Sequence, residues 1–136
     1  MRRARAFGWA PLALALLIGI ALGTGAPSVS AQDLDVPILE RSSGDLDTCA
    51  LGEVANLKPG GDGFLAVRAG PGTDHRKLDQ LKNGDRVWLF DQRGDWVGVI
   101  YDVELVACGP IDKTRMPPHP GRRGWIHMNW VNILAG

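Results

Sequence analysis

The stretch 65–73 constrains the fold of this chain more than any other part of its sequence. Phe64 and Val67 give its first half the aromatic and β-branched character of a short strand, and the Gly-Pro-Gly at 70–72 can continue neither a strand nor a helix. Pro71 fixes φ near the value that a turn needs, and glycines on both sides can take positive φ without strain. The sequence therefore predicts a strand that runs directly into a tight loop.

Residues 1–31 have the organisation of a secretory signal peptide. Three arginines lie within the first five positions, an apolar run covers 11–22, and 29–31 fits the small-residue pattern before a cleavage site. We expect cleavage before Gln32 and a periplasmic or secreted protein with no stable membrane span. The alternative is an uncleaved anchor, but the run is shorter than the roughly 20 apolar residues of a spanning helix.

The remaining 105 residues suit one small domain. Loss of the three leader arginines leaves 12 basic against 15 acidic residues, a net charge of −3, which gives no support to nucleic-acid binding. Residues 32–48 have no sustained apolar period, so we expect a flexible N-terminal segment, followed by the domain proper at 49–136.

The two cysteines, Cys49 and Cys108, are most simply interpreted as one disulfide in an oxidising compartment. Two buried thiols are the alternative. A metal site has less support, because the cysteines are far apart and no histidine lies at a ligand spacing from either.

Short apolar runs alternate with turn signals about every ten residues and predict an all-β fold of five to six short strands. Asn83-Gly84-Asp85 is a strong hairpin signal between two such runs. The segment 109–124 is different, because four prolines and four basic residues predict a long basic loop. The expected strands are 49–57, 64–68, 86–90, 96–106, 124–127 and 131–134, with a tight turn at 128–130.

Four motifs in order resemble the bacterial Src-homology-3 (SH3b) family over about residues 63 to 134. They are the strand and Gly-Pro-Gly at 65–73, the turn at 81–85, the Gly-Asp-Trp strand at 94–99 and the closing Gly-Trp-Ile strand at 124–127. The resemblance implies a small SH3-like barrel and an extracytoplasmic binding module, whose partner is peptidoglycan or a cell-envelope protein. The chain departs from the family in its long connection 102–123 and in the segment around Cys49.

In this fold the loop after Gly-Pro-Gly forms one wall of a groove, which makes Asp74 and His75 candidate ligand contacts; a solvated turn is the alternative. Tyr101 and Trp130 are expected to show a face to solvent and complete the groove. Trp96 and Trp125 stand at strand positions that the family fills for packing, and we expect both in the core.

The basic loop is a second candidate surface, through Lys113, Arg115, Arg122 and Arg123. It would suit a host- or stress-related interaction protein, or an accessory subunit or inhibitor of a wall hydrolase. A solvated insertion is the alternative, and copper binding through Met116 and His119 has weak support.

The sequence offers no catalytic constellation. The histidines are isolated from one another, no zinc-protease spacing occurs, and the aspartates mostly stand in turns. We expect a non-catalytic monomer without cofactor or metal.

Overall fold

The computed structural model describes residues 36–61 and 63–136, and the expected signal peptide at 1–31 lies outside them. The described residues form an all-β domain, as predicted, in which no helix is long and apolar enough to cross a membrane. They contain seven strands rather than five to six, because Lys77–Leu81 also forms a strand. The elements are β1 (Ala50–Val54), β2 (Leu65–Arg68), β3 (Lys77–Leu81), β4 (Arg86–Arg93), β5 (Trp96–Tyr101), β6 (Arg122–His127), the short 3-10 helix η2 (Met128–Trp130) and β7 (Val131–Ala135).

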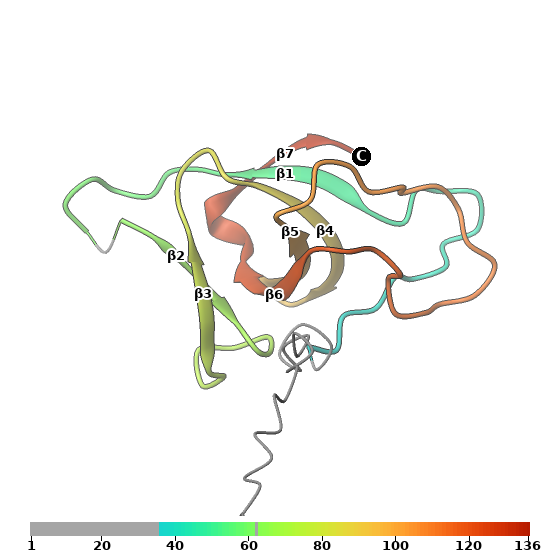
Figure 1. Cartoon of the computed structure of the whole chain (residues 1–136), viewed down its shortest axis with the longest axis horizontal. Helices are drawn as coiled ribbons and strands as arrows, with labels where there is room; N and C mark the ends of the chain where they lie inside the picture. Colours follow the sequence, from blue (N-terminus) through green and yellow to red (C-terminus); the bar gives the residue numbers. More distant parts are fainter. Residues whose placement is uncertain (1–35, 62) are drawn as a thin grey trace, which may run out of the picture.

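The seven described strands form one antiparallel sheet in the order β3-β2-β6-β5-β4-β1-β7. The sheet curls round its own interior without closing, so β3 and β7 are its two edges (Figure 1). Strand β4 pairs with both β5 and β1, and an irregularity in the β4–β5 register between Leu89 and Gln92 lets it bend. The curled sheet gives the domain an interior face and an exterior face.

The interior face holds the main core. In β4, alternate residues Val87 and Leu89 are buried in this core, as the two-residue period of a strand requires. Leu65 and Val67 do the same in β2, and Gly124 leaves room for Val67, which a side chain there would meet. The buried cluster comprises Val54, Leu65, Val67, Leu81, Val87, Leu89, Val97, Val99, Tyr101 and Ile126.

The predicted hairpin at Asn83-Gly84 is wrong. The two strands that it joins, β3 and β4, do not pair with each other, because β3 pairs with β2 at the sheet edge. The turn instead attaches to the end of β1: the N–H of Gly84 donates to the carbonyl of Val54 (2.8 Å), and the Asn83 amide bonds both backbone groups of Leu57 (3.0 Å each). Gly84 has φ of +92°, so the local turn chemistry was correct and only the strand pairing was not.

Strand β5 ends at Tyr101, earlier than the expected 106. Asp102 takes a left-handed φ of +55°, which turns the chain out of the sheet. The connection 102–121 contains no described strand, although Val106 is buried and anchors it. The expected long loop is present, but Arg122 and Arg123 belong to β6.

Residues 36–48, which we name the N-terminal arm, pack against the domain, contrary to the flexible segment expected there. Val36 and Ile38 are 2% and 0% exposed and form a second core with Trp125 on the exterior face of the sheet. Glu40 then forms a two-way backbone bridge with Arg115 of the long loop. The arm therefore covers the exterior face that β5 and β6 would otherwise expose.

Candidate binding groove

An open groove of about 450 Å³ lies between the segment after β1, strand β2 and helix η2. Phe64 and Trp130 supply its aromatic surface. Trp130 is carried by η2, and its backbone carbonyl accepts a hydrogen bond from the N–H of Ala55 (2.9 Å). This bond fixes η2 against the end of β1 and so positions the indole in the groove.

Three basic side chains, Lys58, Arg68 and Lys77, line the same groove. Arg68 and Lys77 are register partners on β2 and β3. The Lys77 ammonium lies 4.2 Å from the centroid of the Phe64 ring, and Arg68 Nη1 donates to the His75 carbonyl (3.0 Å). Two of the cations are thus held in place by an aromatic ring and by a backbone carbonyl.

None of the described residues that line the groove is acidic. The charges that these described residues supply are all positive, while Leu57 and the two aromatic rings supply apolar contact area. Such a surface suits an extended ligand with a hydrocarbon part and an anionic group such as a carboxylate.

Sequence reasoning found only Trp130 among these residues. The sequence pattern assigns Phe64 to the strand and gives no signal for the three basic residues. The two-residue period of β2 contained a usable signal: because Leu65 and Val67 face the core, Ala66 and Arg68 must face outward.

The predicted residues Asp74 and His75 lie in the exposed loop between β2 and β3 and do not line the groove. Their side chains are 87% and 44% exposed, with His75 Nε2 3.9 Å from Asp74 Oδ1. The imidazole occupies the space beside Gly70, where a Cβ would stand 2.5 Å from the ring. The glycine is therefore required for space; neither Gly70 nor Gly72 has the positive φ that the sequence suggested.

Tyr101 does not show a face to solvent, which corrects the prediction, since it is 2% exposed. Its hydroxyl donates to Asp79 Oδ2 (2.9 Å), and Arg122 Nη1 lies 2.8 Å from the same oxygen. Burial, and then the hydrogen bond to Asp79, raise the pKa of the phenol well above its usual range. Asp79 raises the pKa of the Arg122 guanidinium in turn. Tyr101 thus belongs to a separate polar hollow, away from Trp130.

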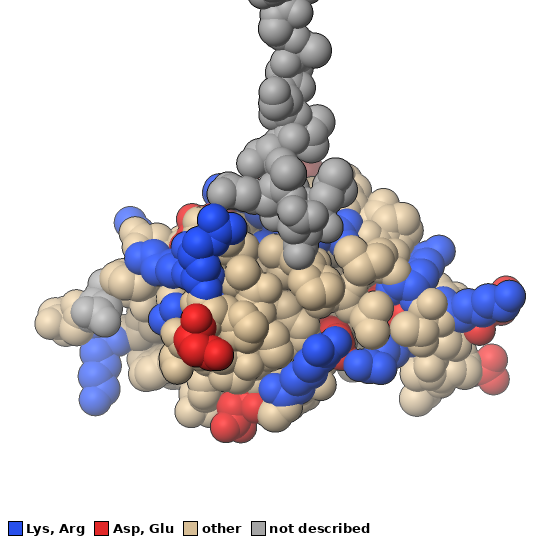
Figure 2. Space-filling view, turned by 90° about the horizontal axis from the view of Figure 1, so that it is seen from below, with Lys and Arg blue, Asp and Glu red and all other residues tan. Residues whose placement is uncertain are grey.

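The four basic candidates of the long loop are not a common patch. Arg115 Nε lies 2.8 Å from Glu40 Oε2, Arg122 pairs with Asp79, and Arg123 Nη2 donates to the carbonyls of Pro117 (2.5 Å) and His119 (2.8 Å). Lys113 is exposed. Figure 2 shows acidic and basic side chains interspersed over the face that it displays.

Of the two tryptophans expected in the core, Trp125 is fully buried. Trp96 is half-buried, packs against the second core, and meets His127 edge-on with ring centroids 5.3 Å apart.

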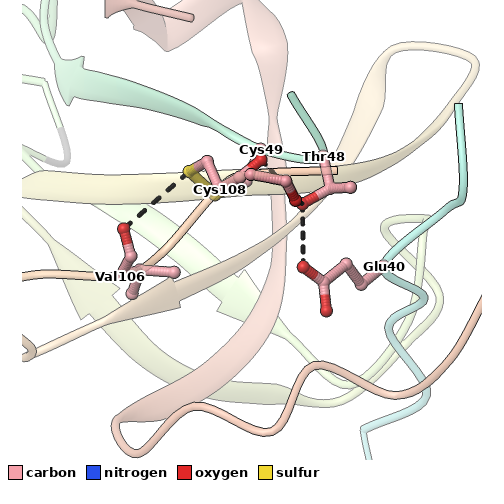
Figure 3. The surroundings of a disulfide bond; sticks show 6 residues. Glu40, Thr48, Cys49, Val106 and Cys108 are labelled. Carbon is pink, nitrogen blue, oxygen red and sulfur yellow. Dashed lines mark hydrogen bonds between the residues drawn. A yellow bond between two sulfur atoms is a disulfide. The ribbon is translucent and has the colours of Figure 1, made fainter. Parts of the chain in front are cut away.

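The predicted disulfide joins Cys49 to Cys108 across 59 positions of the chain. Next to it, the N–H of Thr48 donates to the Cys108 carbonyl (2.6 Å), and the Thr48 hydroxyl donates to Glu40 Oε1 (2.8 Å) (Figure 3). Glu40 is completely buried; among the described residues Arg115 balances its charge, and the Thr48 hydroxyl donates a hydrogen bond to it. The disulfide and this ion pair together attach the arm to the long loop.

Across 36–61 and 63–136, no group of three or more His, Cys, Asp or Glu side chains is placed to hold a metal ion. The cysteines are oxidised, which removes the only thiol nucleophiles of the sequence.

An open, curled antiparallel sheet with a short 3-10 helix before its last strand is the architecture of small, incompletely closed β-barrel domains. The family model of the bacterial SH3 domain matches residues 63–132, just over half of the chain, and this chain belongs to that family. No curated protein and no solved structure matches it. Bacterial SH3 domains are binding modules, often for cell-wall components. The matched range includes β2 to η2, while β1 and the arm precede it.

Proposed function

We propose that this bacterial SH3 domain is a non-catalytic extracytoplasmic binding module that recognises peptidoglycan or a cell-envelope protein through the groove beside η2. One observation carries the proposal: Trp130 and Phe64 line a groove in which the charged residues that the structure describes are all basic. The peptide part of a wall polymer, or an extended segment of an envelope protein, offers both a backbone for aromatic contact and carboxylates for the cations.

The periplasmic or secreted location belongs to this proposal. It is supported by the disulfide, which persists in oxidising compartments, and by the leader-like composition of residues 1–31.

Pelleting of the purified protein with isolated peptidoglycan sacculi tests the proposal. The salt dependence of pelleting cannot show whether the groove or the long loop binds, because both surfaces carry Lys and Arg side chains. Substitutions must distinguish them. Charge reversal of the exposed groove residues in Lys58→Glu and Lys77→Glu should weaken pelleting at least tenfold, which corresponds to about 1.4 kcal/mol of binding free energy.

Lys113→Glu is the matched control, because Lys113 is an exposed lysine of the long loop. It should leave pelleting unchanged. The groove is refuted if Lys113→Glu reduces binding and the two groove reversals do not. If no protein pellets at any salt, an envelope protein becomes the ligand to test, by crosslinking with the same three variants.

A further inference from the structure

The outer edge of β7 is unpaired. Strand β1 pairs with one side of β7, and none of the strands in the described part of the chain pairs with the other. Its five residues therefore present a row of backbone donors and acceptors to solvent, which is the usual template for pairing with another strand.

The two edges of the sheet differ in composition. Strand β3, at the far edge, carries Lys77 and Asp79, and charged side chains are a common protection against edge pairing. Strand β7 has the sequence Val-Asn-Ile-Leu-Ala, with neither charge nor proline. Only the β7 edge thus lacks these protective residues.

The surface round β7 is apolar. Ile133 and Leu134 are 61% and 49% exposed. Two shallow hollows of about 280 and 200 Å³ adjoin the strand, one at Ile133 and the other at Ala135, and share Asp47, Cys49 and Gly136. Asp47 carries the one ionisable side chain among the described residues that line them. Their apolar lining includes Leu89, Val97 and Met128 in the first and Leu51, Trp88 and Val106 in the second.

Two further exposed side chains adjoin this region in sequence. Leu46, 68% exposed, precedes Asp47, and Leu105, 78% exposed, precedes Val106. Together with Ile133 and Leu134 they are four of the five exposed large hydrophobic residues in 36–61 and 63–136. Exposed apolar side chains that gather in one region mark an interaction surface.

We propose that the β7 edge is the interface between two copies of this chain, paired antiparallel across a two-fold axis. A second copy fits because an antiparallel edge is self-complementary, each strand offering the donors that the other lacks. An uncharged strand also brings no like charges opposite each other when it pairs with itself. The proposed dimer replaces the monomer that the sequence analysis predicts.

The dimer is weak. A stable interface buries about 800 Å² on each partner, and an edge of five residues with two adjacent leucine or isoleucine contacts supplies less than that. We therefore expect a dissociation constant in roughly the micromolar range, so that the monomer predominates in dilute solution.

Sedimentation velocity of the whole protein over about a hundredfold range of concentration, centred on that dissociation constant, tests the proposal. Ile133→Lys and Ile133→Glu should each remain monomeric over the whole range, because like charges then face each other across the axis. Both should fold, since Ile133 is mostly exposed, and their thermal unfolding verifies this. Mixed in equal amounts, the two variants should again form dimers, because opposite charges then meet.

Gln80→Lys, on the exposed part of β3, places the same charge on the other edge and should dimerise as the native chain does. The proposal is overturned if the native protein is monomeric throughout, if its dimer survives Ile133→Lys, or if mixing the two Ile133 variants restores no dimer. A dimer lost in Gln80→Lys would also overturn it and would move the interface to β3.

Discussion

The packing of the N-terminal arm on the exterior face can be tested by measuring the energetic coupling between two residues, Ile38 and Gly98. Ile38 is fully buried, and it lies directly over Gly98 of β5. A Cβ at Gly98 would stand 2.9 Å from both Cγ1 and Cγ2 of Ile38, well inside ordinary carbon contact distances of about 3.5–4.0 Å. The two residues should therefore be coupled energetically.

The magnitudes follow from the contacts. Ile38→Ala removes a buried side chain and should lower the free energy of unfolding by about 2–5 kcal/mol. Gly98→Ala should lower it by roughly 1–3 kcal/mol through overpacking. In the double variant the clashing Cγ atoms are gone, and the nearest atom of residue 38 is its Cβ at 3.4 Å. The loss should then fall at least about 1 kcal/mol short of the sum of the single losses.

Equilibrium unfolding in urea of the native protein, both single variants and the double variant measures this coupling. Ile38→Val, with an expected loss of about 0.5–1.5 kcal/mol, replaces Ile38→Ala if the larger truncation does not fold. Gly109→Ala is the control, because a Cβ there meets nothing within 4 Å. If the single losses in unfolding free energy add to the double-variant loss within about 0.5 kcal/mol, the packing of Ile38 on Gly98 is refuted. An Ile38→Ala protein of native stability would show that the arm does not pack on the domain.

Three further predictions concern the attachment of the arm, the ion pairs and the alkaline limit of stability. Reduction of Cys49–Cys108, which closes a loop of 59 positions, should destabilise the fold by up to about 4 kcal/mol; a thermal midpoint unchanged by reductant would contradict this. Arg115→Ala should cost about 3 kcal/mol because it leaves the buried Glu40 carboxylate without its cation, whereas Lys113→Ala, at an exposed position of the same loop, should stay within about 0.5 kcal/mol of the native protein. If urea unfolding gives the same loss of unfolding free energy for Arg115→Ala and Lys113→Ala, the ion pair with Arg115 does not stabilise the buried Glu40. The pKa of Tyr101 is raised in the folded protein, so the neutral phenol stabilises the fold. This contribution to the free energy of unfolding is fully present below the unfolded tyrosine pKa of about 10 and is lost as the pH rises above that value. Tyr101→Phe should abolish this alkaline decline in stability, and a decline of the same size in that variant would assign it to other groups.

The strand pattern and the disulfide could be predicted because they depend on local chemistry. Alternation in 86–90, the glycine turns and the cysteine pair need no knowledge of which strand lies beside which. The hairpin at Asn83-Gly84 failed for the opposite reason, since the turn signal specifies a local bend, while strand pairing is decided by long-range burial. The flexible segment failed because Val36 and Ile38 are too few to give a period. Their burial depends on packing against Trp125 on the exterior face, which only the folded sheet creates.

For the proposed groove, sequence reasoning named Trp130, which lines it, and missed the basic residues beside it. Trp130 could be named because a core this small cannot bury all of its tryptophans. Lys58 and Lys77 are separated from it by most of the domain, and only the pairing of β2 with β3 and the fixing of η2 on Ala55 bring them together. The charge of Arg115 alone suggested a ligand surface. Its ion-pair partner Glu40 could not be recognised from the sequence, because it lies 75 positions away.

The pairing of β1 with β7, the first and last described strands, also determines when this domain can fold during its synthesis. The arm is made early, yet it packs on Trp125 and bonds to Arg115, and Cys49 must wait for Cys108. A growing chain therefore holds Val36 and Ile38 without partners until almost the whole sequence has been made, and contacts of such high sequence separation form slowly. Folding of this domain should be a single late event rather than a stepwise one, which leaves the unfinished chain dependent on factors that keep it from aggregating.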